Sequence, residues 1–167
     1  MSVRTLDSEV FSGYAPEGEQ PVRSYAVLMS VFAALAGLFA TWFRASGRKL
    51  PDRIEAGDLL LVTVASHKAS RLIAKDKVTA PIRAPFARYE GEAGPSEVSE
   101  QPRGTGLRRA IGELLVCPYC LGMWTSAAFT AGLLVLPRFT RWVASVLVTF
   151  FGSEILQIAY KKAEDTL

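Results

Sequence analysis

Two cysteines stand three positions apart in Cys117-Pro118-Tyr119-Cys120, and they are the only cysteines among the 167 residues. A Cys-x-x-Cys pair can share a metal ion, form a disulfide or exchange one. Because Pro118 favours the first turn of a helix, the sequence predicts that Cys117 is an N-cap and that Cys120 lies one turn inside. The positive end of a helix dipole favours thiolates, so local redox chemistry is one interpretation.

Metal binding is the second interpretation of the pair. A structural zinc ion needs four ligands, and the chain has one histidine, His67, besides the two cysteines. Zinc is therefore the candidate cofactor only if His67 and a carboxylate join the thiolates, or if a second chain supplies another pair. The sequence favours a third interpretation, in which Cys117 and Cys120 are small side chains that pack at a helix end.

Glu154 is the one acid deep inside a long apolar segment. An ionisable group at such a place is a candidate functional residue, and a partner would reduce the cost of its burial. The sequence predicts Arg71 or His67 as that partner, in an ion pair between helices or in a transport or catalytic site. The ion pair is the favoured alternative.

Two further contacts are expected near the cysteine pair. Glu113 lies one turn before Cys117 and could orient a thiol or cap the helix, and Asp76 with Arg83 could order the adjacent loop. The predicted polar cluster comprises His67, Arg71, Glu113, Cys117, Cys120 and Glu154.

The elements that position these residues are long apolar segments, since half of the chain is apolar and gathered into blocks. A helix of about 20 apolar residues spans the hydrocarbon core of a bilayer. The predicted fold is an all-α integral membrane protein, a bundle of four, alternatively three, transmembrane helices with a long cytoplasmic loop. We expect a flexible tail at 1–23, helices at 24–43, 57–74, 111–137 and 141–162, and a loop at 75–110 with a disordered linker at 90–106.

The helix at 57–74 decides the number of spans, because it contains Lys68 and Arg71. It either spans the membrane, with these side chains reaching the cytoplasmic interface, or lies on the surface. Both arrangements place most Lys and Arg residues inside, as the positive-inside rule requires. Each predicts a multi-pass protein of the plasma membrane whose long basic loop and C-terminus are cytoplasmic.

An ordered series of short motifs resembles a known family. The motifs are DLL at 58–60, ASHKASRL at 65–72, DKVT at 76–79, IRAPF at 82–86 and GELLVCPYCLGMW at 112–124. They resemble the domain of unknown function 1360 family, small bacterial and phage membrane proteins that include a sporulation protein. The resemblance covers about residues 58–160 and implies a helical membrane fold without an established activity. Its signature residues here are Asp76, Arg83, Pro85, Phe86, Gly122 and Trp124.

The leading functional interpretation is non-enzymatic. It is a small membrane protein that acts by partner binding, as an accessory or assembly factor. The alternatives are a membrane thiol or metal protein that uses Cys117 and Cys120, and an oligomeric small transporter or channel. The expected partners are the lipid bilayer and a membrane protein or a second copy of the chain, and no nucleic acid is expected.

Overall fold

The computed structural model describes Tyr14 and residues 21–166. These residues are mostly helical, but they also contain one antiparallel two-stranded sheet, so the expectation of a purely helical fold is wrong. The elements are α2 (Val22–Ala45), α3 (Ala56–Lys75), η1 (Lys77–Thr79), α4 (Ala80–Arg83), β1 (Ala87–Gly94), β2 (Glu97–Pro102), α5 (Gly106–Val116), α6 (Pro118–Val135) and α7 (Pro137–Glu164). The predicted tail at 1–23 lies outside the described residues, apart from Tyr14, Pro21 and the first two residues of α2.

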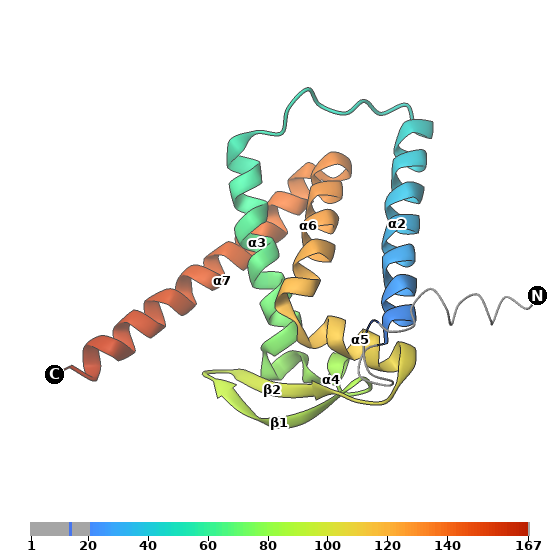
Figure 1. The fold of residues 1–167 in the computed structure, drawn as a ribbon. Helices are drawn as coiled ribbons and strands as arrows, with labels where there is room; N and C mark the ends of the chain where they lie inside the picture. The colour runs from blue at the N-terminus through green and yellow to red at the C-terminus, as the bar shows by residue number, and fades with distance from the viewer. Residues whose placement is uncertain (1–13, 15–20, 167) are drawn as a thin grey trace, which may run out of the picture.

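The long helices run between two ends of the molecule. Figure 1 shows α2, α3 and α6 upright, with the β-hairpin and α5 below them and the 46–55 segment above. The helix α7 starts at the upper end, crosses α3 and α6, and then runs outward away from the other helices. Buried small residues, Ala65 on α3 and Ala144 on α7, allow the crossing helices to approach closely.

Two helices, α2 and α7, are long and apolar enough to cross a membrane. The pair formed by α5 and α6 also passes this test together, but it is bent by 80°. The composition of the described helices therefore indicates association with a membrane, through two spans or three.

The helix predicted at 111–137 is broken in two. Cys117 has an extended backbone (φ −105°, ψ 104°), and α6 starts afresh at Pro118. Pro118 has no backbone N–H to donate to the preceding turn, so it can begin a helix but disrupts one that continues through it. As a result α5 lies across the end of the bundle, while α6 runs along it.

The segment predicted as a disordered linker at 90–106 is ordered. Most of it forms the hairpin of β1 and β2, in which Tyr89 pairs with Glu100 and Glu92 with Val98. The hairpin turns at Ser96, whose φ is 63°. Only a few apolar side chains, such as Ala87 and Val98, are buried in it. Ion pairs of Arg71 and Arg83, and a backbone hydrogen bond from Lys77 N–H to the Ser96 carbonyl (2.9 Å), also attach it to the rest of the molecule.

Candidate functional site

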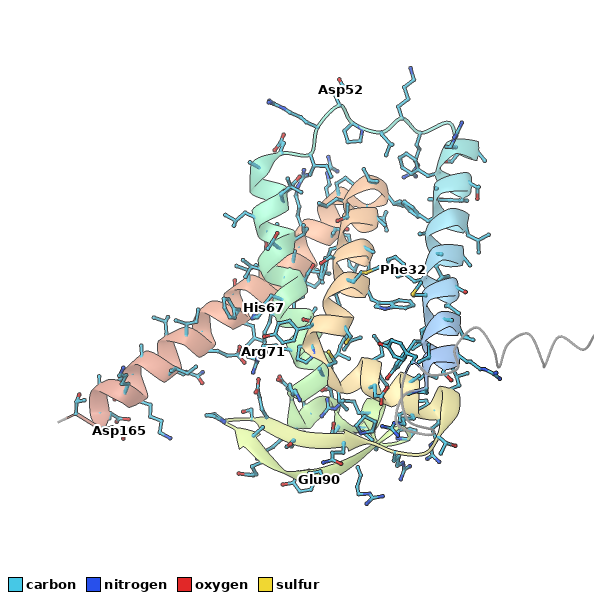
Figure 2. The ribbon with its side chains drawn as sticks, viewed as in Figure 1. Phe32, Asp52, His67, Arg71, Glu90 and Asp165 are labelled. Atoms are coloured by element: carbon cyan, nitrogen blue, oxygen red, sulfur yellow. The ribbon has the colours of Figure 1, made fainter. Side chains whose placement is uncertain are left out.

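The polar residues gather where the hairpin meets the helices. We call this region the hairpin end: the last turns of α3, η1, α4, the β1–β2 hairpin, α5 and the first turn of α6. Figure 2 shows Arg71 directed toward this end and Glu90 at its outer edge, whereas Asp52 lies at the opposite end of the molecule.

Lys68 is one of the residues that link α3 to α7. Its side chain is 3% exposed, and Nζ lies 2.6 Å from Glu154 Oε1 and 3.8 Å from Asp76 Oδ2. The ammonium group also stands 4.2 Å from the ring centroid of Phe150 on α7. Sequence reasoning missed this role, because it treated Lys68 as a cation that reaches toward water, and it named Arg71 or His67 as the partner of Glu154.

We therefore expect Lys68 and Glu154 to be energetically coupled. Lys68→Met and Glu154→Gln should each destabilise the protein, with a coupling free energy of about 0.5–3 kcal/mol in a double-mutant cycle. Thermal unfolding in detergent would measure it. The pair Arg71→Leu with Glu154→Gln is the matched control and should be closer to additive. Additive losses for Lys68 and Glu154 would contradict the assignment.

Arg71 and His67 make other contacts. The Arg71 guanidinium binds the carboxylate of Glu97 on β2, with Nη2 2.6 Å from both Oε1 and Oε2. This geometry is the two-bonded fork that arginine forms with carboxylates. His67 is exposed and packs edge to face against Phe151 of α7, with ring centroids 5.4 Å apart. Arg71 thus ties α3 to the hairpin, and His67 contacts α7.

Arg83 is completely buried and joins three elements. Its Nη1 donates to the Ile73 carbonyl (2.6 Å), and its Nη2 donates to the Asp76 carbonyl (3.0 Å). Its Nε forms an ion pair with Glu100 on β2, and Nη1 also contacts Thr79 Oγ1 at 2.7 Å. The expected link between Asp76 and Arg83 thus runs through the Asp76 backbone, and Glu100 is the partner that the sequence did not indicate.

Asp76 follows the last residue of α3, and its carboxyl group lies 3.8 Å from the Lys68 ammonium group. Burial raises the pKa of Asp76, and the nearby Lys68 lowers it by less, so that the net shift is upward. A carboxyl group with a raised native pKa holds a proton at pH values where the unfolded chain, with a pKa near 3.9, has lost it.

This shift predicts a pH dependence. The stability that Asp76 contributes is present below about pH 4 and is lost as pH rises through the raised native pKa. The Asp76→Asn variant has no carboxyl group to ionise and does not suffer that loss. The unfolding free energy of the variant relative to that of wild type should therefore increase between about pH 4 and pH 7. Unfolding midpoints measured across this range would test it. A difference that stays constant with pH would contradict it.

Glu113 contacts α2 and its own helix. Its carboxylate accepts a hydrogen bond from the Tyr25 hydroxyl on α2 and pairs with Arg109 Nε at 2.9 Å. The bond from Tyr25 fastens the start of α2 to α5, and the pair with Arg109 lies within α5. They differ from the expected roles, which were to orient a thiol or cap a helix.

The cysteine pair lies at the start of α6. The Cys117 Sγ accepts a hydrogen bond from the Cys120 backbone N–H at 3.2 Å, so Cys117 caps the helix. Both thiols are free; Cys117 is half-buried and Cys120 exposed. Within residues 21–166 and Tyr14, no group of three or more His, Cys, Asp and Glu side chains could hold a metal ion. The structure therefore does not bring His67 and the two cysteines together as one ligand set.

Two of the remaining signature residues, Pro85 and Phe86, lie against α5 through their backbone carbonyls. The Pro85 carbonyl accepts hydrogen bonds from Arg108 Nε (2.9 Å) and Nη2 (2.7 Å). The Phe86 carbonyl accepts one from the Arg103 backbone N–H (2.9 Å), and it lies directly against Gly112. These contacts attach α5 to the chain between α4 and β1.

Trp124 and Gly122 lie further along α6. The Trp124 ring meets Phe32 of α2 edge to face at 5.0 Å, whereas no side chain or backbone of another element lies within 4 Å of the position a Cβ would take on Gly122. Trp124 thus faces α2, and Gly122 faces open space.

The chain matches a known protein family. The family model described as "Protein of unknown function (DUF1360)" matches residues 61–160, more than half of the chain. The chain belongs to this family. The match to DUF1360 covers α3 from its second turn, the hairpin end and most of α7, whereas α2 precedes it.

Two relatives from Bacillus subtilis (strain 168) are similar. Sporulation protein YjcA is 32% identical over 92 residues, which cover 53% of this chain and 78% of YjcA. UPF0713 protein YngL is 28% identical over 111 residues, covering 65% of this chain and 82% of YngL. No solved structure matches this DUF1360 member.

Proposed function

We propose that this DUF1360 protein crosses the membrane four times and binds a partner protein through its hairpin end on the cytoplasmic side. In this role it serves as an accessory or assembly factor. One observation carries the proposal. The hairpin and α5 form an ordered part of the hairpin end that presents apolar side chains outward, and buried or partly buried ion pairs hold it on the bundle.

The course of the helices supports four spans. In Figure 1, α2 runs upward, α3 downward, α6 upward and α7 downward, so that the described termini lie toward the hairpin level. Although α3 is less apolar than α2 and α7, its Lys68 and Arg71 have acidic partners, which lowers the cost of placing them near the membrane.

Charge supports the cytoplasmic side for the hairpin end. With the hairpin end inside, 12 of the 18 Lys and Arg residues within 21–166 lie on the cytoplasmic side or in the last turns of α3 next to it. The positive-inside rule favours this orientation.

Thiol labelling tests the arrangement. In a background with Cys117→Ser and Cys120→Ser, single cysteines are placed at Ser96 in the hairpin turn and at Asp52 in the 46–55 segment. A membrane-impermeant maleimide should label Asp52→Cys in intact cells and label Ser96→Cys only after permeabilisation. Labelling of both positions in intact cells, or the reverse pattern, would contradict the proposed topology.

Apolar side chains on the hairpin end supply the binding surface. Tyr119 is 93% exposed and Val78 is 78% exposed, and Ile82, Tyr89 and Leu107 are also exposed. Tyrosine and large aliphatic side chains that are exposed on a rigid surface are typical anchors of protein interfaces. The ion pairs of Arg71 and Arg83 hold the hairpin in place, and its strand β1 contains Tyr89.

Affinity purification from the native membrane tests partner binding. Wild type should retain a co-purifying protein that the double variant Val78→Ser with Tyr89→Ser loses. Leu50→Ser is the matched control, because Leu50 is 68% exposed at the opposite end. Loss of the partner in both variants, or in neither, would contradict binding through the hairpin end.

A membrane dithiol is the second candidate function. The free Cys117 and Cys120 at a helix N-terminus, with Cys120 exposed, are the observation that favours it. It requires the pair to cycle between dithiol and disulfide in cells, which trapping with a thiol reagent before lysis would detect. A pair that stays fully reduced under oxidative and resting conditions alike would rule it out.

A further inference from the structure

An apolar groove of about 420 Å³ separates α2 from α6. None of the described residues that line it is charged, and α6 contributes small side chains that leave space facing the aromatic side chains of α2. Figure 2 shows Phe32 directed from α2 into this space. Its lining includes Phe32 and Phe39 of α2, and Trp124, Ala128, Ala131 and Leu134 of α6.

A cationic group lies at one end of the groove. Arg48 Nη1 donates a hydrogen bond to the Val135 carbonyl (3.1 Å), one residue beyond the groove residue Leu134. The same guanidinium lies 5.7 Å from the Trp42 ring, and that ring lies 6.1 Å from the groove residue Phe39. Arg48 therefore connects both walls of the groove at the end that faces away from the hairpin.

The chain around Arg48 is strongly basic. Residues 44–53 contain Arg44, Arg48, Lys49 and Arg53 against a single acid, Asp52, and Arg44, Arg48 and Lys49 are exposed. In the proposed topology this end faces away from the cytoplasm, so the positive-inside rule does not account for these charges. An anionic ligand would account for them.

The length of the groove corresponds to one leaflet of a bilayer. Its α6 wall extends from Trp124 to Leu134, which at about 1.5 Å per residue is about 15 Å. The hydrocarbon core of a bilayer is about 30 Å thick, so one leaflet contributes about half of that. The groove thus begins at a basic end, where headgroups lie, and ends near the middle of the membrane.

We propose that this groove binds one acyl chain of an anionic phospholipid, whose phosphate contacts Arg48 and Lys49. The inference rests on the proposed membrane topology. The apolar walls accommodate the chain, and the exposed cations select the headgroup through Coulomb attraction and hydrogen bonds. The bound lipid fills the space between α2 and α6 and so stabilises α2, which lies outside the family match, against the other helices.

Tryptophan quenching by brominated lipids tests the proposal. A variant with Trp42→Phe and Trp142→Phe keeps Trp124, which lines the groove. In phosphatidylcholine vesicles, chain-brominated phosphatidylglycerol should quench Trp124 at about tenfold lower mole fraction than chain-brominated phosphatidylcholine, given two nearby surface cations. Arg48→Gln with Lys49→Gln should remove this preference, and Ala131→Phe, which fills the groove, should weaken quenching by both lipids.

Three results would overturn the lipid site. Equal quenching by the two brominated lipids in the parent variant indicates only bulk lipid at the protein surface. Weak quenching by both, together with cross-linking of two chains through α2, indicates that a second copy fills the groove. A variant that keeps only Trp142, which is exposed on α7, distinguishes failure of the lipid site from failure of the topology. If neither lipid quenches Trp142, the protein is not in the bilayer and the proposed topology is wrong.

Discussion

Arg83→Met is expected to lower the free energy of unfolding by about 3–5 kcal/mol, the range for breaking one side of a buried ion pair. The substitution leaves the Glu100 carboxylate, which is only 6% exposed, without its cation. It also removes the donor for the Ile73 and Asp76 carbonyls. Chemical or thermal unfolding in detergent micelles would measure the loss.

Two further variants sharpen this prediction. Arg83→Lys should be nearly as damaging, because an ammonium group cannot reproduce the planar fork that reaches a carboxylate and two carbonyls together. Lys77→Gln breaks the exposed pair of Lys77 with Glu92 (2.5 Å) and should leave the midpoint almost unchanged. If Arg83→Met behaved like Lys77→Gln, the buried contacts of Arg83 would not contribute to holding the hairpin on the helices.

Gly112→Ala is the second substitution with a large expected effect. A Cβ on Gly112 would lie 2.5 Å from the Phe86 carbonyl oxygen and 3.1 Å from Pro102 Cβ. The nearest atom belongs to the backbone, so α5 would have to move away from the hairpin. We expect a loss of about 1–3 kcal/mol, the usual cost of overpacking a well-packed site.

Gly122→Ala is the matched control for Gly112→Ala. Both glycines are helical and belong to the same motif series, but a Cβ at Gly122 would meet no atom of the described residues within 4 Å outside its own helix. Alanine is also the better helix former, by up to about 1 kcal/mol. Unfolding of both variants should show a loss for Gly112→Ala alone, and equal losses would contradict the close approach of α5 to Phe86.

The family and the approximate positions of the long helices could be predicted from the sequence. The motif series between positions 58 and 124 is specific, and apolar runs such as 24–43 are long enough to indicate a helix without further information. Cysteine followed by proline also signalled the start of a helix. What the sequence did not show is that this start also ends the helix before it, which places α5 across the bundle.

The hairpin and the ion pairs could not be predicted from these patterns. Residues 90–106 are rich in Gly, Glu, Ser and Pro, which are not typical of strands, and the hairpin is fixed by Arg71 and Arg83 rather than by an apolar face. The partner of Glu154 depends on how α3 is rotated about its axis. His67, Lys68 and Arg71 are close in sequence, and only tertiary packing directs Lys68 toward α7.

Site-specific photo-crosslinking in the native membrane tests the central claim most directly. A photoreactive amino acid is placed at Val78 or Tyr89 on the hairpin end, and at Leu50 on the opposite end as the control. Partner binding through the hairpin end predicts a discrete cross-linked protein from Val78 and Tyr89 and none from Leu50. No product at the hairpin end, or the same product from both ends, would contradict it.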